Sequence, residues 1–264
     1  MRATRRLRQT TGGSARQRAR SPREAPAWRH AIARQVRAPV TSAIAPGSAS
    51  AYTSAVMKQA TYVALQATWP RQGRHILAHF DAESIVVYQA YRPSIAQFAV
   101  AQQRFGGEFS YERMSWIKPN FLWMMYRSGW AQKEGQERIL AVRLPRAFFD
   151  ALLRAAVPSA FDPSRFSSHG EWQAAIRHSD VRLQWDPDHA PDGTPLERRA
   201  LQLGLRGEAL RRYGAQQAMT IADITDFVHA QAANLRHGEA SLCLPHERVY
   251  MPEASAARAV GLDF

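Results

Sequence analysis

The sequence predicts an α+β fold: a single compact domain in which a mixed or split β-sheet is flanked by helices, preceded by a basic N-terminal tail. Three observations predict it. Residues 1–56 are rich in arginine and lack sustained apolar periodicity. From about residue 71, segments with strand period occur in runs of two or more between helical segments, which is typical of α+β proteins. A chain of 264 residues with 45% hydrophobic residues can also bury a sizeable core.

The tail, residues 1–56, carries most of the basic charge. It holds eleven arginines and one acid, so it supplies +10 of the formal net charge of +13 and leaves +3 for residues 57–264. We expect the tail to be disordered. Three interpretations of it stay open: an RNA- or DNA-binding arm, an organellar transit peptide, or residues upstream of a translation start at Met57.

The first half of the domain predicts three strands and a helix. Pro93 opens a segment whose apolar positions keep helical spacing until Gly106-Gly107. Strands are favoured elsewhere by β-branched and aromatic residues. In chain order, the elements are a strand over 74–80, a strand over 84–91 after a turn at 81–83, the helix from Pro93, and a strand over 109–117.

A short helix over 119–128 follows, buried on most sides. Pro119 stands at its first position and Gly129 just past its end, which is the expected asymmetry. Residues 121–126 are apolar nearly all round. We therefore expect most sides of this helix to be covered by other parts of the domain.

The second half predicts further strands and helices, closing at residue 252. Thr194 and Glu197 match a capping box, but leucines alternate with other residues over 201–205, which favours a strand. The predicted elements are a strand over 138–144, helices over 145–156 and 171–177, strands over 181–185 and 199–206, helices over 207–217 and 223–235, and a strand over 241–250. Residues 253–264 are expected to be a C-terminal extension of the globular domain 57–252.

Several classes of protein are excluded or disfavoured. The single cysteine, Cys243, rules out an internal disulfide framework and multi-cysteine zinc sites, and it favours a reducing, cytoplasmic location. No apolar run approaches the roughly 18 residues of a membrane span, so we expect a soluble protein without membrane contact. Neither a GxGxxG nor a Walker-type loop is present.

The start of the helix at Lys118-Pro119 is the strongest candidate for an anion site. A helix N-terminus offers free backbone N–H groups and a partial positive charge, both of which attract phosphate. Lys118 stands at this end, and Arg113 and Ser115 precede it on the strand. The alternative is that Arg113 pairs with Glu112 or Glu137, while Lys118 reaches solvent.

Two strand ends supply further candidates. Tyr88, Gln89, Tyr91 and Arg92 cluster at the end of one strand. Gln202 and Arg206 share one face of another strand if the alternating leucines face the core. Such clusters suit ligand binding, although a solvated face explains them equally well.

Aromatic and basic residues around the helix have two interpretations each. Trp116, Trp123 and Trp130 can stack on a base or a nicotinamide ring, but tryptophans of this kind more often belong to the core. Arg127 lies in the last helical turn, where a cation commonly caps backbone carbonyls. We expect the capping role for Arg127.

An acidic cluster at 186–192 is the only metal candidate. Asp186, Asp188, His189 and Asp192 offer hard oxygen ligands for Mg²⁺ or Ca²⁺. However, Asp-Pro-Asp and Pro-Asp-Gly are ordinary turn formers. No histidine pair has zinc-ligand spacing, so we assign no metal site.

The block Arg113 to Trp130, RMSWIKPNFLWMMYRSGW, resembles the hallmark of a bacterial and fungal family that is known as a domain of unknown function. Supporting blocks are VYQAY at 87–91, QERIL at 136–140, QWDPDH at 184–189 and RALQLGLR at 199–206. The resemblance covers about residues 71–252. It implies no activity, and it favours Met57 as the start of the chain.

A remote resemblance to ADP-ribosyltransferase-like folds implies a split sheet around an NAD cleft. By this resemblance Gln89 or Arg92, Ser115 and Gln202 occupy the catalytic strand positions. Arg113 and Lys118 then contact the pyrophosphate, with Arg92 and Arg206 as further anion contacts. Trp116 and Tyr88 are the aromatic candidates for stacking. The family's glutamate is replaced by Gln202, which puts transfer to protein acceptors in doubt.

The sequence therefore leads to a functional hypothesis with alternatives. We expect a transferase that uses a nucleotide or NAD and acts on a nucleotide or nucleic-acid substrate. The alternatives are a non-catalytic nucleic-acid-binding module, and a partner-binding domain whose aromatic block is wholly core.

Overall fold

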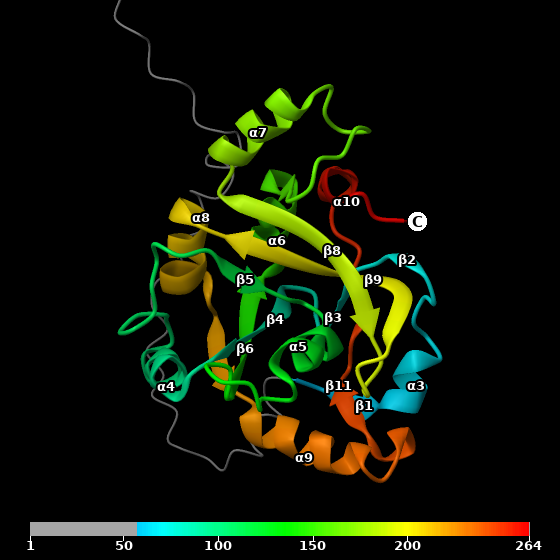
Figure 1. Ribbon diagram of the computed structural model, residues 1–264. Helices are drawn as coiled ribbons and strands as arrows, with labels where there is room; N and C mark the ends of the chain where they lie inside the picture. Colours follow the sequence, from blue (N-terminus) through cyan, green and yellow to red (C-terminus); the bar gives the residue numbers. More distant parts are fainter. Residues whose placement is uncertain (1–56, 264) are drawn as a thin grey trace, which may run out of the picture.

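The computed structural model describes residues 57–263 and confirms the α+β fold class. Helices and short strands surround a central group of longer strands (Figure 1). The expectations for the tail 1–56 lie outside the described residues. Within the described part, no helix is long and apolar enough to cross a membrane.

Two sheets form the centre of the domain. In the first, β4 lies beside β6 and β6 beside β10, all antiparallel. In the second, the order is β2-β9-β8-β7, and β5 also pairs with β9. The strands of the first are β4 (Ser84–Tyr91), β6 (Arg138–Pro145) and β10 (Thr220–Asp223). Those of the second are β2 (Gly73–Arg74), β5 (Ser115–Ile117), β7 (Val157–Pro158), β8 (Val181–His189) and β9 (Pro195–Leu205).

One bridge joins the two sheets between β4 and the residue that follows β5. Tyr88 N donates to Lys118 O at 2.7 Å, and Lys118 N donates to Tyr88 O at 3.2 Å. One residue further along β4, a side chain makes the contact with β5: Gln89 Nε2 donates to Trp116 O at 3.2 Å. The first and second sheets therefore separate at this point, and the site described below lies where they separate.

Helices and small two-stranded sheets cover this centre. The helices are α3 (Tyr62–Gln66), α4 (Pro93–Gln102), α5 (Phe121–Ser128), α6 (Arg146–Ala155), α7 (His169–His178), α8 (Gly207–Arg212), α9 (Thr225–Leu235) and α10 (Ala254–Val260). A π-helical turn (Tyr213–Gln217) extends α8, and a 3₁₀ turn (Glu239–Ser241) follows α9. The small sheets pair β1 (Gln59–Thr61) with β11 (Cys243–Pro245), and β3 (Leu77–Ala78) with β12 (Arg248–Val249).

Helix α5 forms as its end residues predict. Asn120 is the N-cap, and its Oδ1 accepts a hydrogen bond from Trp123 N at 2.6 Å. Gly129 ends the helix with φ of 59°, a left-handed conformation that glycine adopts at no steric cost. Phe121 to Met125 are all buried, so the predicted burial of this helix on most sides is confirmed.

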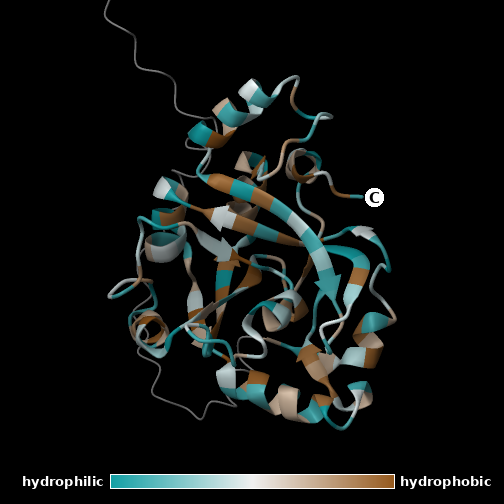
Figure 2. Ribbon diagram, in the orientation of Figure 1, coloured by the Kyte–Doolittle hydropathy of each residue, from teal (hydrophilic) through white to brown (hydrophobic). Residues whose placement is uncertain are grey.

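The core divides into two clusters on opposite faces of the first sheet. Val87 and Val142 face the cluster that includes Phe149 of α6 and Val260 of α10. Val86 and Ala141 face the other cluster, which holds α5 and α9 residues. Figure 2 shows hydrophobic residues on the central strands, whereas the outlying helix α7 contains no buried residue.

Some predicted elements differ in the structure. The segment expected as a C-terminal extension contributes to the core, because Ala256, Ala257 and Val260 of α10 are buried there. The strand expected over 241–250 is broken into β11 and β12, which pair with different partners. The strand expected over 109–117 is only three residues long.

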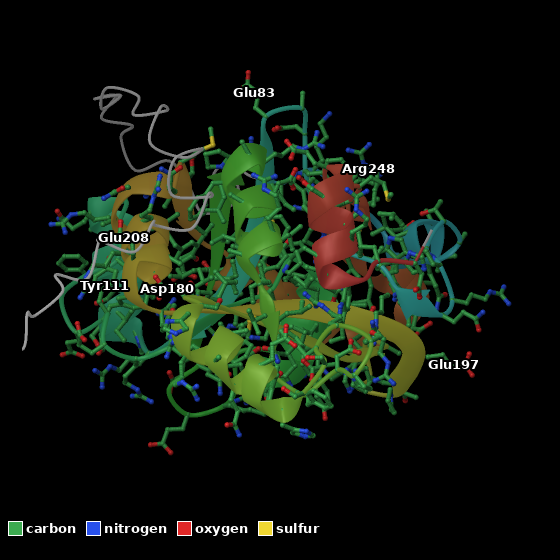
Figure 3. All side chains as sticks on the ribbon, turned by 90° about the horizontal axis from the view of Figure 1, so that it is seen from above. Glu83, Tyr111, Asp180, Glu197, Glu208 and Arg248 are labelled. Atoms are coloured by element: carbon green, nitrogen blue, oxygen red, sulfur yellow. The ribbon has the colours of Figure 1, made fainter. Side chains whose placement is uncertain are left out.

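The turn into α8 depends on a close approach by Asp180. Gly207 has φ of 54°, and a Cβ there would lie 2.8 Å from Asp180 Oδ1. Asp180 Oδ2 accepts a hydrogen bond from Glu208 N at 3.1 Å, and both side chains are seen at this end of α8 in Figure 3. Tyr111, at the same side of the molecule, packs against Gly214 of the π-helical turn.

Candidate functional site

A cavity of about 530 Å³ opens where β4 and β5 separate. Six of the nine residues proposed from the sequence line it: Gln89, Arg113, Ser115, Trp116, Lys118 and Gln202. They come from β4, from β5 and its flanks, and from β9. The bridge between Tyr88 and Lys118 joins β4 to the end of β5, and β5 pairs with β9. Residues that the sequence did not single out for this site also line it, among them Met114, Met124, Gln136 and Gln184.

A hydrogen-bonded chain holds Ser115 in place at the cavity. Tyr213 Oη donates to Gln89 Oε1 at 2.6 Å, and Gln89 Nε2 donates to Ser115 Oγ at 2.8 Å. The Tyr91 hydroxyl lies 2.8 Å from the same Ser115 Oγ. Burial raises the pKa of both tyrosines, so each stays protonated at neutral pH. Ser115 is thus positioned by an amide and a phenol, neither of which can take its proton.

Gln89 is the central member of this chain and is only 2% exposed. Gln89→Leu is expected to lower the free energy of unfolding by about 1–3 kcal/mol, because the buried Tyr213 hydroxyl loses its acceptor. Urea unfolding measures this loss. Gln132→Leu is the matched control on the exposed surface, where a change within about 0.5 kcal/mol is expected. Equal effects of the two substitutions would contradict the assigned role of Gln89.

Lys118 is the most unusual residue of the cavity. Its side chain is buried, with 5% of the residue exposed, and its Nζ has no hydrogen bond or ion pair with any residue of 57–263. Burial, together with the positive charge of Arg127, lowers the pKa of Lys118 to about 8, while the charge of Asp186 partly opposes them. The alternative in which Lys118 reaches solvent is therefore wrong.

Arg113 has none of the partners that the alternative interpretation gave it. Glu112 pairs instead with Arg211 at 3.0 Å, and Glu137 Oε1 accepts from Gly135 N at 2.7 Å. The exposed guanidinium of Arg113 has no ion pair among the described residues. It is free to contact a ligand in the cavity.

Arg127 also differs from its expected capping role. Lys133 Nζ takes that role, since it donates to Tyr126 O at 3.2 Å and to Arg127 O at 2.9 Å. The Arg127 side chain lines the cavity and, within residues 57–263, has no ion pair of its own. Three cations, from Arg113, Lys118 and Arg127, therefore share one cavity.

Asp186 holds two glutamines of the cavity lining in place. Its Oδ1 accepts from Gln184 Nε2 at 2.8 Å, and its Oδ2 accepts from Gln202 Nε2 at 2.7 Å. Gln184 and Gln202 are directly opposite each other on β8 and β9, and Asp186 is two residues along from Gln184 on the same face. Asp186 thus belongs to strand β8 and not to the expected turn. The sequence signal for this is that Gln184 and Asp186 are two residues apart, as side chains on one face of a strand are.

Two of the backbone amides at the start of α5, which the sequence offered to an external anion, are occupied by side chains. Phe121 N donates to Glu247 Oε1 at 2.8 Å, and Trp123 N donates to Asn120 Oδ1. Glu247 is 1% exposed, and burial raises its pKa well above the usual range. The expected anion site at the helix N-terminus is thus wrong in this respect, and Lys118 contributes its side chain to the cavity instead.

Three of the proposed residues lie away from the cavity. Tyr88 is fully buried on the other face of β4, where its ring packs edge-on against Phe121. Arg92 is exposed and pairs with Glu108 at 2.8 Å. Arg206 Nε donates to Ser179 O, and its Nη2 donates to the carbonyls of Ile176 and Arg177 at the end of α7. Stacking by Tyr88 and anion binding by Arg92 and Arg206 are therefore corrected to structural roles.

Of the three tryptophans, only Trp116 lines the cavity. Trp123 is buried and stacks on His189, and Trp130 Nε1 donates to Pro191 O. Trp116 lies close to Gly204 of β9, where a Cβ would be 3.0 Å from the indole ring. The glycine therefore makes room for an aromatic ring at the cavity wall.

The acidic cluster 186–192 does not converge on a metal site. Asp188 forms a buried ion pair with Arg198 at 2.7 Å, and Asp192 accepts from Thr194 N at 2.8 Å. Over the part of the chain that the structure describes, no group of three or more histidine, cysteine, aspartate or glutamate side chains is placed to hold a metal ion. Asp188 and Asp192 therefore take part in an ion pair and in a turn.

Comparisons with known proteins agree with the resemblance of the sequence blocks. Residues 75–250 match the profile of a family described as a domain of unknown function, DUF4291. No curated protein matches the chain.

Proposed function

The chain belongs to the DUF4291 family, and we propose from its site that it is a transferase that binds a nucleotide, or NAD, in the cavity between β4 and β5. One observation carries this proposal. Arg113, Lys118 and Arg127 line one cavity without ion-pair partners among residues 57–263. Cations that lack internal partners and line a shared cavity suit an anionic ligand.

The three cations suit a phosphate-bearing ligand. The guanidinium groups of Arg113 and Arg127 can each form two parallel hydrogen bonds to a phosphate, while the Lys118 ammonium acts as a point charge. A cavity of about 530 Å³ is within the usual size range for small-molecule sites. Together these features favour a nucleotide or dinucleotide over a bare phosphate ion.

The remaining lining residues support recognition of a base and a sugar. Trp116 offers an aromatic face at the cavity wall. Gln89 and Ser115 offer polar atoms whose positions the Tyr213 chain fixes. Gln184 and Gln202 add two further amides to the lining, and the Asp186 carboxylate fixes both by accepting from their Nε2 atoms.

Thermal unfolding of the full chain tests the proposal. ADP-ribose, NAD and ADP are each added at about 100 times their Kd, where binding stabilises the fold by roughly 2.7 kcal/mol. For a domain of this size, we expect the melting temperature to rise by about 5–10 °C with at least one of them.

Arg113→Ala and Arg127→Ala are each expected to weaken this ligand by roughly 10- to 100-fold, since each removes a charge-assisted contact. Arg92→Ala is the control, because Arg92 is exposed and away from the cavity. An absence of any shift with all three ligands would overturn the proposal. So would an equal shift in the wild type and in the double arginine variant.

The alternative of a non-catalytic nucleic-acid module receives less support. Residues 57–264 carry a formal charge of only +3. Salt-dependent binding of single-stranded RNA by residues 57–264 alone would favour that alternative. The proposed location is the cytoplasm, which the single cysteine supports.

A further inference from the structure

Lysine is rare in this chain, and its positions are informative. Only three of the 35 lysine and arginine residues are lysines: Lys58, Lys118 and Lys133. Lys58 and Lys133 are exposed, whereas Lys118 is buried in the cavity wall. Arginine remains charged at any physiological pH, but a lysine amine can lose its proton and become a nucleophile. The one buried cation of the cavity wall among residues 57–263, Lys118, is therefore a lysine in a chain that otherwise uses arginine almost throughout.

The surroundings of Lys118 leave its amine available for chemistry. The backbone is fixed by two hydrogen bonds to Tyr88, and Met124 and Trp116 line the cavity beside the side chain. A buried lysine with a structural role normally has a carboxylate or several carbonyls as partners. The Lys118 Nζ has no such partner in the described part of the chain. Burial also lowers its pKa to about 8, so a useful fraction of the amine is neutral near neutral pH.

We propose that Lys118 forms an imine with the carbonyl carbon of a phosphorylated aldehyde or reducing sugar, whose phosphate is held by Arg113 and Arg127. The inference rests on the proposed anion-binding function of the same cavity. It extends that function from binding to covalent chemistry. The ring-opened terminal ribose of ADP-ribose is one such aldehyde, which connects the two proposals.

The reaction balances without a further reactant. The lone pair of the Lys118 Nζ attacks the carbonyl carbon, a C–N bond forms, and the carbonyl oxygen takes a proton. The carbinolamine then loses this oxygen as water while C=N forms, so both amine protons leave with the oxygen. The proton passes from nitrogen to oxygen through solvent water, while the charge of Asp186 acts on Lys118 from beyond ion-pair distance and favours its ammonium form.

Reductive trapping tests the inference on the full-length chain. The protein is incubated with glyceraldehyde 3-phosphate and cyanoborohydride, which converts an imine to a stable secondary amine. Peptide mass spectrometry then measures the labelling of all three lysines in one sample. Lys118 is expected to be labelled at least tenfold faster than Lys58 or Lys133, with a rate that rises with pH up to about 8. The charges that act on Lys118 in this range are Arg127 of α5 and Asp186 of β8.

Two controls separate recognition from simple reactivity. Glyceraldehyde, which has no phosphate, is expected to lose the preference for Lys118, and so is the Arg113→Ala/Arg127→Ala variant with the phosphorylated probe. Lys118→Arg keeps the charge but has no primary amine that can form an imine, so no trapped adduct is expected at position 118.

The outcomes distinguish this inference from the proposed function. Pyrophosphate binding with no preferential labelling of Lys118 would overturn the inference and leave the anion site standing. Failure of the wild type to bind pyrophosphate, ADP or ADP-ribose would overturn both. Preferential labelling that persists with glyceraldehyde would contradict the role given to the phosphate.

Discussion

Lys118→Met is expected to raise the free energy of unfolding by up to about 3 kcal/mol at pH 7. The folded-state pKa of Lys118 is about 8, against 10.5 as the ordinary value, and each unit corresponds to roughly 1.4 kcal/mol. Methionine has a similar shape and no charge to bury. Urea unfolding at several pH values measures the gain.

The pH dependence of this gain follows from the sign of the shift. Between about pH 8 and 10.5 the unfolded chain binds the Lys118 proton and the folded chain does not, so wild-type stability rises with pH across this window. The advantage of Lys118→Met is therefore complete below pH 8 and disappears toward pH 10.5. The variant should also lose phosphate binding, because it lacks the Lys118 ammonium. In this account the wild type keeps a lysine that lowers its stability because the lysine binds the ligand.

Lys133→Met is the matched control for the methionine substitution. Lys133 is exposed and its Nζ donates to two carbonyls at the end of α5, so its loss should be neutral or slightly destabilising. A large destabilisation by Lys118→Met would show that the Lys118 ammonium has a structural partner. That result would contradict the assignment of Lys118 to ligand binding.

Arg198→Met is expected to cost about 3–5 kcal/mol, the largest loss predicted for this fold. Arg198 and Asp188 form an ion pair at 2.7 Å, with side chains only 5% and 1% exposed. Removal of the arginine leaves a buried carboxylate without its countercharge. Arg198 Nη1 also donates to Pro70 O at 2.6 Å, so the connection before β2 loses a tether.

Proton uptake by Asp188 should make this loss depend on pH. Burial already raises the pKa of Asp188, and the neighbouring Arg198 lowers it. Without Arg198 the pKa of Asp188 rises further, so the carboxyl binds a proton at low pH and the uncompensated charge disappears. The destabilisation by Arg198→Met should therefore be smaller at pH 5 than at pH 8.

An exposed ion pair is the control for the buried one. Arg211→Ala breaks the pair with Glu112, which is exposed on both sides, and a loss below about 1 kcal/mol is expected. The double variant Arg198→Met/Asp188→Leu should recover most of the stability, since both charges are removed. Equal losses for Arg198→Met and Arg211→Ala would contradict the importance of burial.

Local sequence signals predicted the elements that local contacts form. Asn120 and Gly129 cap the two ends of α5 through contacts within a few residues. Both ends of the helix were predicted to within two residues. The alternating leucines of 201–205 placed β9 correctly. Ser115 and Gln202 were grouped through the remote resemblance, and the β5–β9 pairing brings both to one cavity.

Contacts between distant residues could not be predicted in this way. Glu247 accepts from Phe121 N across 126 positions of the chain, so nothing near Lys118 indicated that this amide was occupied. The strands β1 and β11 are each three residues long and pair with each other, so their positions depend on a contact between distant parts of the chain. The choice of Lys133 over Arg127 as the helix cap likewise depends on how the chain turns after Gly129.

Isothermal titration of ADP-ribose into the full-length protein tests the central claim, that the cavity between β4 and β5 binds a phosphorylated ligand. We expect saturable one-site binding to the wild type. We also expect binding at least tenfold weaker in Arg113→Ala/Arg127→Ala and unchanged binding in Arg92→Ala. Binding that is equal in the wild type and the double variant, or absent from the wild type, would contradict the claim.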